Sequence, residues 1–183
     1  MSTAAATRTR TTWKIDPAHS LIEFAVRHLM ITTVKGRFAV VEGAVQLDEA
    51  DPSLVDVDVR IDAASIDTRE AQRDAHLRSA DFFDVESHPH ITFTSTRPIA
   101  GRGSEFKLAG DLTIHGVTKE VVLDVTEEGR GKDPWGGERL GFSATTKIKR
   151  SEFGLTWNQA LEAGGVLVGD DIKISLDLEL VKA

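Results

Sequence analysis

Apolar and polar residues alternate along several segments of this chain, and alternation with a period of two is typical of half-buried β-strands. The clearest case spans residues 172–180, where isoleucine and leucine alternate with polar side chains. The same pattern recurs over residues 22–26, 55–61, 106–114, 121–125 and 142–148. One wet and one dry face is typical of antiparallel sheets, because parallel sheets are covered on both faces. The pattern therefore predicts an antiparallel all-β fold.

About eight long strands are expected, and an antiparallel sheet of that size tends to close on itself because open edges invite aggregation. A closed barrel of about eight strands leaves an interior wide enough for side chains or for one small ligand. Three glycines lie inside strand patterns, where glycine permits bending at barrel corners or the close approach of another group: Gly43, Gly110 and Gly141. His115–Gly116 predicts a tight hairpin turn, and the glycine-rich residues 127–139 predict a longer hairpin loop.

One short helix is expected among the strands. Asp67 and Glu70 can form a capping box, and residues 69–79 contain no glycine, proline or β-branched residue. One face of this helix would present a cation, a titratable ring and an apolar side chain, with a carboxylate at its flank: Arg73, His76, Leu77 and Asp74.

Length and composition fit one domain. The 183 residues are 40% hydrophobic and 28% charged, which is ordinary for a globular protein. We expect a disordered tail over residues 1–11 and one barrel domain over residues 12–183. The formal net charge of −7 disfavours a nucleic-acid partner, because phosphate binding depends on clustered cations.

The sequence contains no cysteine and no segment with the pattern of a targeting signal. No apolar run approaches the ~18 residues of a transmembrane helix. The first ten residues contain no apolar segment typical of a secretory signal, so a cytoplasmic location is the expected default. The lack of cysteine excludes disulfides, thiolate nucleophiles and cysteine-based metal sites.

Residues 73–84 place charged side chains next to two adjacent phenylalanines, between segments with strand patterns. This combination suits the mouth of a pocket for an amphipathic ligand. Arg73-Asp74-x-His76-Leu77 and Asp81-Phe82-Phe83-Asp84 resemble motifs of the YceI-like family of polyisoprenoid-binding proteins. Four further segments resemble that family in the same order: 13–20, 89–96, 110–119 and 150–155. The resemblance implies a lipocalin-like barrel around a long apolar cavity that holds an isoprenoid or a similar lipid.

The candidate site residues fall into two groups. The first would meet the polar head of a ligand at the mouth: Arg73, Asp74, His76, Lys119 and Arg150. The second would line the apolar interior: Leu29, Met30, Phe38, Leu77, Phe82, Phe83, Phe93, Phe153 and Trp157. Because Phe82 and Phe83 are adjacent, we expect them to point in opposite directions on extended backbone. The alternatives are that Arg73 pairs with Glu70 or Asp74 on a solvated helix, and that the apolar side chains fill an ordinary core.

Metal and catalytic chemistry find little support. His88 and His90 would share one face of a strand, but zinc needs a third protein ligand, and the sequence places none beside them. We therefore expect no metal and no cofactor other than a bound lipid. Asp74 and His76 are about 200° apart around a helix, which disfavours an acid/base pair. An enzyme that modifies an isoprenoid or quinone with His76, Asp74 and Arg73 remains the alternative function.

A non-catalytic carrier is the function expected from these patterns. Burial contributes about 0.8 kcal/mol per methylene-sized unit, so several isoprene units outweigh the ~4 to 15 kcal/mol cost of association. A polyprenyl chain, an isoprenoid quinone, a fatty acid or an amide would suit such a cavity. Its delivery requires a donor and an acceptor, so transient membrane contact is compatible with this function. By the same resemblance a homodimer is one state to test, and a plain interaction domain with a filled core is the remaining alternative.

Overall fold

The computed structural model describes residues 9–39, 41–51, 54–162 and 164–183. Its eleven strands form one antiparallel sheet: β1 Arg10–Ile15, β2 Leu21–His28, β3 Thr32–Phe38, β4 Val41–Asp48, β5 Val55–Asp62, β6 Ile66–Asp67, β7 His90–Arg102, β8 Glu105–Ile114, β9 Val117–Lys132, β10 Glu138–Lys149 and β11 Val168–Lys182. The helices are α1 (Ala71–Arg78) and the short 3-10 helices η1 (Pro17–His19), η2 (Ala63–Ser65) and η3 (Arg150–Phe153). Among the described residues, no helix combines the length and apolar character needed to span a bilayer.

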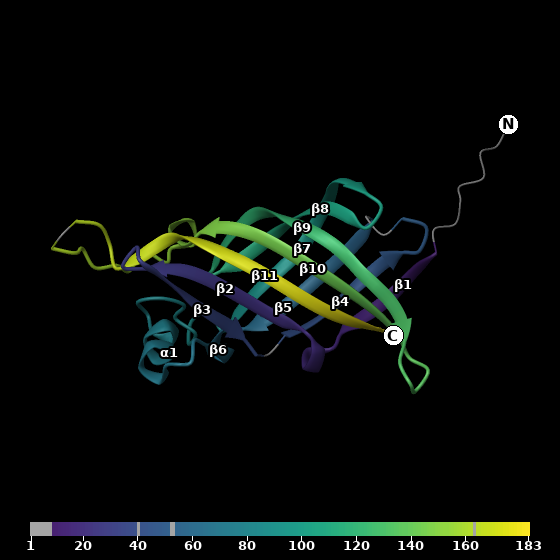
Figure 1. Ribbon diagram of the computed structural model, residues 1–183, viewed down its shortest axis with the longest axis horizontal. Helices are drawn as coiled ribbons and strands as arrows, with labels where there is room; N and C mark the ends of the chain where they lie inside the picture. Colours follow the sequence, from purple (N-terminus) through teal and green to yellow (C-terminus); the bar gives the residue numbers. More distant parts are fainter. Residues whose placement is uncertain (1–8, 40, 52–53, 163) are drawn as a thin grey trace.

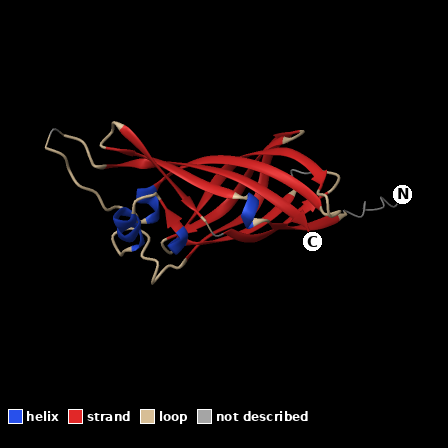
Figure 2. Cartoon of the chain, turned by 60° about the horizontal axis from the view of Figure 1, so that its bottom comes forward, coloured by secondary structure: helices blue, strands red, loops and turns tan. Residues whose placement is uncertain are grey.

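Eight of the strands close into a ring: β1, β4, β5 and β7 to β11. Closure occurs because β1 pairs with β4 on one side and with the end of β11 on the other. The first part of β11 pairs instead with β2, and β2, β3 and β6 extend the wall toward the end that carries α1 (Figures 1 and 2). This confirms the predicted antiparallel barrel of about eight strands with one short helix.

The glycines inside the strands have two different roles. A Cβ atom at Gly110 would lie 2.3 Å from the ring of Phe93, and one at Gly43 would lie 2.4 Å from the Asp58 carbonyl oxygen. These two glycines therefore allow the close approach of a neighbour, and Gly110 also lies beside a register shift in the β7–β8 pairing. Gly141 lies beside a register shift in the β9–β10 pairing, as expected for a bend.

The barrel end opposite α1 is tightly packed. Trp13, Leu47, Leu140 and Leu180 are each at most 1% exposed, and the pairing of β1 with the end of β11 brings them together near the C-terminus (Figure 1). This layer closes the far end of the barrel. The packing of these four side chains therefore favours the α1 end as the entry route to the interior.

An ion-pair network crosses the surface near this closed end. Arg139 Nη1 lies 2.6 Å from an Asp16 oxygen and 2.8 Å from a Glu179 oxygen, and Arg139 Nε lies 3.0 Å from Asp133. The backbone amide of Gly137 and then Arg139 hold the pKa of Asp133 below its ordinary value. Hydrogen bonds from His19 and then Arg139 likewise lower the pKa of Asp16.

These lowered pKa values predict an acid-dependent contribution to stability. It is complete above the ordinary aspartate pKa of about 3.9 and is lost as the pH falls through the folded-state values. We therefore expect Arg139→Ala to lower the melting temperature more at neutral pH than below about pH 3.9. Melting curves across this range measure the effect, with the exposed pair of Arg97 and Glu120 as the control through Arg97→Ala. Parallel curves for Arg139→Ala and the unmodified protein would contradict the expectation.

The helix begins later than the sequence predicts. Glu70, not Asp67, caps α1, and its carboxylate accepts hydrogen bonds from the backbone N–H groups of Gln72 and Arg73. Asp67 lies in β6 and accepts a 2.8 Å hydrogen bond from the Arg69 backbone N–H instead. Pairing of β6 with β3 keeps Asp67 extended, so the predicted capping box does not form.

The predicted turn at His115–Gly116 is confirmed, whereas the following loop and the start of β1 differ from expectation. His115 and Gly116 have φ angles of 54° and 73°, as the predicted tight turn requires. The loop expected over residues 127–139 is confined to 133–137, because β9 and β10 remain paired up to Lys132 and Glu138. Strand β1 already begins at Arg10, within the predicted tail, and residues 1–8 of that tail lie outside the described residues.

Candidate functional site

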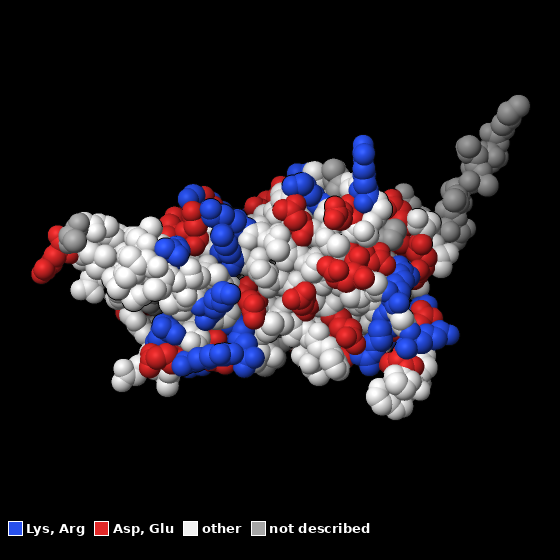
Figure 3. Space-filling model, in the orientation of Figure 1, with Lys and Arg blue, Asp and Glu red and all other residues white. Residues whose placement is uncertain are grey.

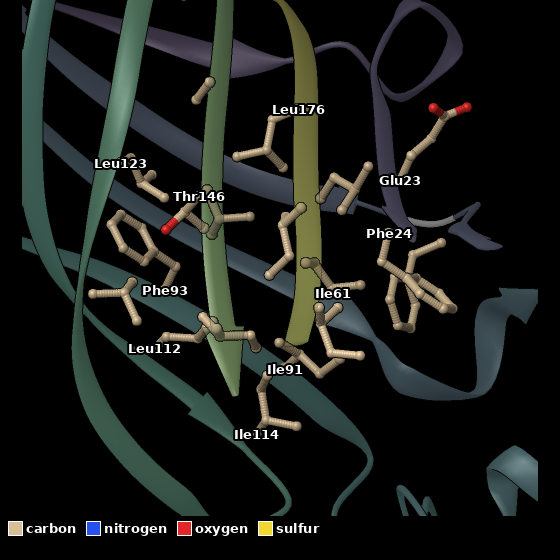
Figure 4. A pocket seen from close by; sticks show the side chains of 18 of the residues that line it. Glu23, Phe24, Ile61, Ile91, Phe93, Leu112, Ile114, Leu123, Thr146 and Leu176 are labelled. Atoms are coloured by element: carbon tan, nitrogen blue, oxygen red, sulfur yellow. The ribbon is translucent and has the colours of Figure 1, made fainter. Parts of the chain in front are cut away.

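The barrel encloses an apolar cavity with a volume of about 220 Å³. In Figure 4, the labelled apolar side chains point into the interior from strands on different sides of the wall, whereas Glu23 points away from them. Residues lining this barrel cavity include Phe24, Val57, Ile61, Ile91, Phe93, Leu112, Leu123, Ala144, Thr146, Ile174 and Leu176. The interior is therefore hollow, which contradicts the alternative of a filled core.

A second pocket, with a volume of about 350 Å³, adjoins the cavity at the α1 end. We call it the mouth pocket, and its wall is formed by Phe24, Val26, Arg27, His28, Val34, Thr68, Gln72, Arg73, His76, Leu77, Phe82, Trp157, Leu167 and Val168. Phe24, Val26, Leu77, Phe82 and Val168 line both spaces. At about 30 Å³ for a water-sized group in a liquid, the two spaces together accommodate on the order of twenty methylene-sized groups.

Arg150 is a charged side chain at the α1 end of the barrel cavity. It is buried and lines the barrel cavity. Its guanidinium donates to the carbonyl oxygens of Leu155 at 2.7 Å, Gly169 at 2.9 Å and Trp157 at 3.0 Å, with a longer contact to Val168. Burial lowers the pKa of Arg150, while the charge of Asp170 opposes that effect. A guanidinium has five N–H groups, so one donor remains beyond these four hydrogen bonds.

Arg73 and Asp74 both form hydrogen bonds with Thr68. Arg73 donates from Nε to Thr68 Oγ1 and from Nη2 to the Thr68 carbonyl oxygen, both at 2.7 Å. Asp74 is buried and accepts hydrogen bonds from the Thr68 backbone N–H at 2.9 Å and from Thr68 Oγ1 at 2.5 Å. The alternative in which Arg73 pairs with Glu70 or Asp74 is therefore wrong. Arg73 lines the mouth pocket, whereas Asp74 lines neither space.

His76 forms part of an aromatic wall in the mouth pocket. Its ring lies edge-on to Trp157 with a centroid distance of 4.7 Å and edge-on to Phe82 at 5.1 Å. Phe82 and Trp157 contact each other at 5.3 Å. His76 Nε2 lies 2.9 Å from an Asp81 carboxylate oxygen, so the hydrogen-bond partner of this ring is Asp81 and not Asp74.

The predicted lining residues divide between wall, core and rim. Five of them line the barrel cavity: Phe38, Leu77, Phe82, Phe83 and Phe93. Trp157 lines the mouth pocket. Phe153 is a fully buried core residue, and Leu29 and Met30 form the turn between β2 and β3 outside both spaces. Lys119 is exposed and lines neither space.

Phe82 and Phe83 correct one further prediction. They occupy a turn after α1 and not extended backbone, so both rings reach the barrel cavity. Phe82 contacts Trp157, and Phe83 contacts Phe38 edge-on at a centroid distance of 6.0 Å. The adjacent pair therefore joins the mouth pocket to the barrel wall.

Several lining residues were missed by reasoning from sequence. Arg27 and His28 end β2 beside the mouth pocket, and Thr146 brings a hydroxyl to the barrel cavity, where it donates to the Val122 carbonyl oxygen at 2.9 Å. The alternation in residues 142–148 gives the inward register of Thr146. His28 continues the alternation of Ile22, Phe24 and Val26 by one step, so that pattern could have identified it, whereas Arg27 has the opposite parity and no signal in the sequence marks it.

Comparison with known proteins places this geometry in a family. Residues 13–180 match the YceI-like domain. A UPF0312 protein of Serratia proteamaculans is 40% identical over 173 residues, covering 93% of this chain and 86% of that protein. The crystal structure of a Campylobacter jejuni YCEI protein has a TM-score of 0.72 and 35% identity, covering 86% of this chain and 90% of that one.

A more distant structure shares the fold alone. It is a polyisoprenoid binding domain from Saccharophagus degradans, with a TM-score of 0.67 and 16% identity, covering 94% of this chain and 99% of that one. The domain match spans the barrel from β1 to β11, including the α1 segment and the mouth pocket. The chain thus belongs to the YceI-like family.

Proposed function

We propose that this protein binds one long apolar ligand with a polar end and carries it without catalysing a reaction. The observation that carries the proposal is the apolar barrel cavity and its junction with the mouth pocket. Family membership supports a lipid as the ligand, and so does one structural neighbour, which is a polyisoprenoid binding domain. A polyisoprenoid or isoprenoid quinone is the preferred class, and fatty acids or amides are substitutes of similar shape.

The ligand would enter with its tail toward the closed end of the barrel. That end is packed with Trp13 and Leu180, whereas the polar groups lie at the other end. Arg73 and His76 line the mouth pocket, and Arg150 keeps one N–H free of the four carbonyl contacts described above. A polar head beside these donors would retain hydrogen bonds while the tail replaces water in the cavity.

Native mass spectrometry of the purified protein, followed by organic extraction, tests the proposal. We expect one co-purifying lipid per chain whose tail has on the order of twenty methylene-sized groups. Delipidated protein should then be saturated by a prenyl alcohol or a quinone of that length. Repeated absence of bound lipid, together with no binding of either compound, would overturn the carrier function.

Whether the bound lipid is chemically changed distinguishes an enzyme from a carrier. It requires His76, Asp74 and Arg73 to act together on a substrate, but Asp74 is turned toward Thr68 and His76 binds Asp81. We expect extracted lipid to be chemically unchanged after incubation with the unmodified protein and with His76→Ala. Conversion of the lipid that disappears in His76→Ala would favour the enzyme.

Transfer of the ligand would use an apolar rim around the mouth pocket. Met30 and Ile31 are 54% and 70% exposed at the β2–β3 turn, and Val166 is also exposed. The Leu29 backbone N–H donates to the Leu167 carbonyl oxygen at 2.8 Å, which joins that turn to the segment before β11. Figure 3 shows mainly uncharged side chains over this protruding end of the molecule. We propose that the rim makes transient contact with a membrane.

Ile31→Ser is expected to slow lipid transfer between vesicles about five- to tenfold, because partial burial of isoleucine in lipid contributes about 1 kcal/mol or more. A fluorescent prenyl or fatty-acyl lipid reports the transfer rate. Ile99→Ser provides the matched control, since Ile99 is 43% exposed on β7 away from the mouth. Equal transfer rates for the two variants would contradict a role for the rim.

A further inference from the structure

Three side chains able to ligate a metal converge outside the lipid site. Asp84, His88 and His115 each offer one donor atom, and these atoms all lie within 4.8 Å of one another. The two imidazole rings meet edge-on with a centroid distance of 4.9 Å. All three residues are half-buried, and none of them lines the barrel cavity or the mouth pocket.

The local backbone holds these donors in place. Asp84 follows α1 with a φ angle of 47°, and its carbonyl oxygen accepts a 2.8 Å hydrogen bond from the His88 backbone N–H. His115 has a φ angle of 54° in the β8–β9 turn. A Cβ atom at Gly116 would lie 2.8 Å from His88 Cε1, and one at Gly154 would lie 3.2 Å from His115 Nδ1. The two glycines therefore leave room for both rings.

The donor atoms of this cluster have no other partner in the described part of the chain. No hydrogen bond or ion pair there involves the Asp84 carboxylate or a ring nitrogen of His88 or His115. A half-buried carboxylate beside two unpaired imidazoles is an arrangement that a cation would satisfy. Asp16, His19 and Glu179 form a second cluster of possible metal ligands. Arg139 already forms ion pairs with both carboxylates of that cluster, so its ligands are occupied.

We propose that Asp84, His88 and His115 form a binding site for a zinc-type divalent cation. Zinc takes imidazole nitrogen and carboxylate oxygen at about 2.0 to 2.2 Å, so tetrahedral donors lie about 3.4 Å apart. Small side-chain rotations bring donors now within 4.8 Å to that spacing. Three protein ligands leave the fourth position for water. Asp84 and His115 supply the ligands beside His88, and His90, the first residue of β7, is exposed and not part of the site.

A metal ion at this site would link the segment after α1, which carries Asp84 and His88, to His115 in the β8–β9 turn. That segment carries Phe82 and Phe83, which line the barrel cavity. The cation would therefore stabilise the folded protein and order one side of the mouth. This inference does not depend on the identity of the lipid, or on lipid binding at all.

Calorimetric titration of tag-free, delipidated, chelator-treated protein with zinc tests the site. We expect one zinc ion per chain and a melting temperature that rises with zinc concentration. Asp84→Asn, His88→Ala and His115→Asn should each weaken binding at least about tenfold. Asparagine suits the left-handed backbone at residues 84 and 115, so the first and third variants preserve the turns. His90→Ala is the matched control and should bind zinc as the unmodified protein does.

Two results would overturn the proposal. One is the absence of zinc binding by the unmodified protein, and the other is equal zinc affinity in His88→Ala and His90→Ala. Circular dichroism of each variant identifies any loss of fold. If one ligand variant fails to fold, the other two still decide between a site and no site, because they alter different segments of the chain.

Discussion

Replacing Ala144 by phenylalanine is expected to abolish most lipid binding while leaving the barrel folded. Ala144 is buried on β10 and lines the barrel cavity. A phenyl ring would occupy the space of about six methylene groups of the ligand. Each methylene group displaced from the cavity would weaken the binding free energy by about 0.8 kcal/mol. The sum of about 5 kcal/mol corresponds to an affinity loss of about three orders of magnitude. Titration of delipidated protein with a fluorescent lipid measures it.

Thr145→Phe provides the control for this substitution. Thr145 is the next residue on β10, but it is exposed and lines neither space. Its phenylalanine variant adds the same ring outside the wall and should bind lipid normally. The melting temperature of Ala144→Phe should stay the same or rise, because the new ring fills empty volume. Lipid affinity that is equal in both variants would show that the ligand lies outside the cavity.

The sequence predicts the barrel well because a closed barrel has one apolar and one solvent-facing surface, and this difference appears as alternation along each strand. Each inward residue of 172–180 faces a hollow, and each outward residue faces water, so the pattern is visible without coordinates. The role of Gly110 is not visible, because it depends on Phe93 of a neighbouring strand. Periodicity gives the direction of a side chain, but not the size of the group opposite.

The mouth is harder to predict because its residues come from turns and from one short helix. Phe82 and Phe83 break the rule for adjacent residues, since they lie on a turn. The motif suggested that Asp74 contacts the head group of a ligand, but its carboxylate accepts hydrogen bonds from Thr68 instead. His88 and His115 are distant in sequence and meet only because the segment after α1 lies beside the β8–β9 turn. Long-range pairing of this kind leaves no local signal.

Asp74→Ala is expected to lower the free energy of unfolding by about 2 to 4 kcal/mol. Thr68 is 4% exposed, and Asp74 accepts hydrogen bonds from both its backbone N–H and its hydroxyl. Alanine would leave both buried donors without their acceptor, and water could not replace it without opening the contact between α1 and β6. Urea denaturation measures the change, and Asp81→Ala, at an exposed carboxylate, should change it by less than about 0.5 kcal/mol.

Asp74→Asn separates this structural role from contact with a ligand. Asparagine retains the carbonyl oxygen that Thr68 requires but removes the charge, so the loss should fall to about 1 kcal/mol. A structural Asp74 predicts that stability follows the acceptor oxygen and that lipid affinity of the folded asparagine variant is unchanged. A head-group contact predicts the reverse, with normal stability and weakened binding in both variants. The stability and binding measurements distinguish the two roles, because Thr68 needs only an acceptor oxygen, whereas a head group that donates to the Asp74 carboxylate also depends on its charge.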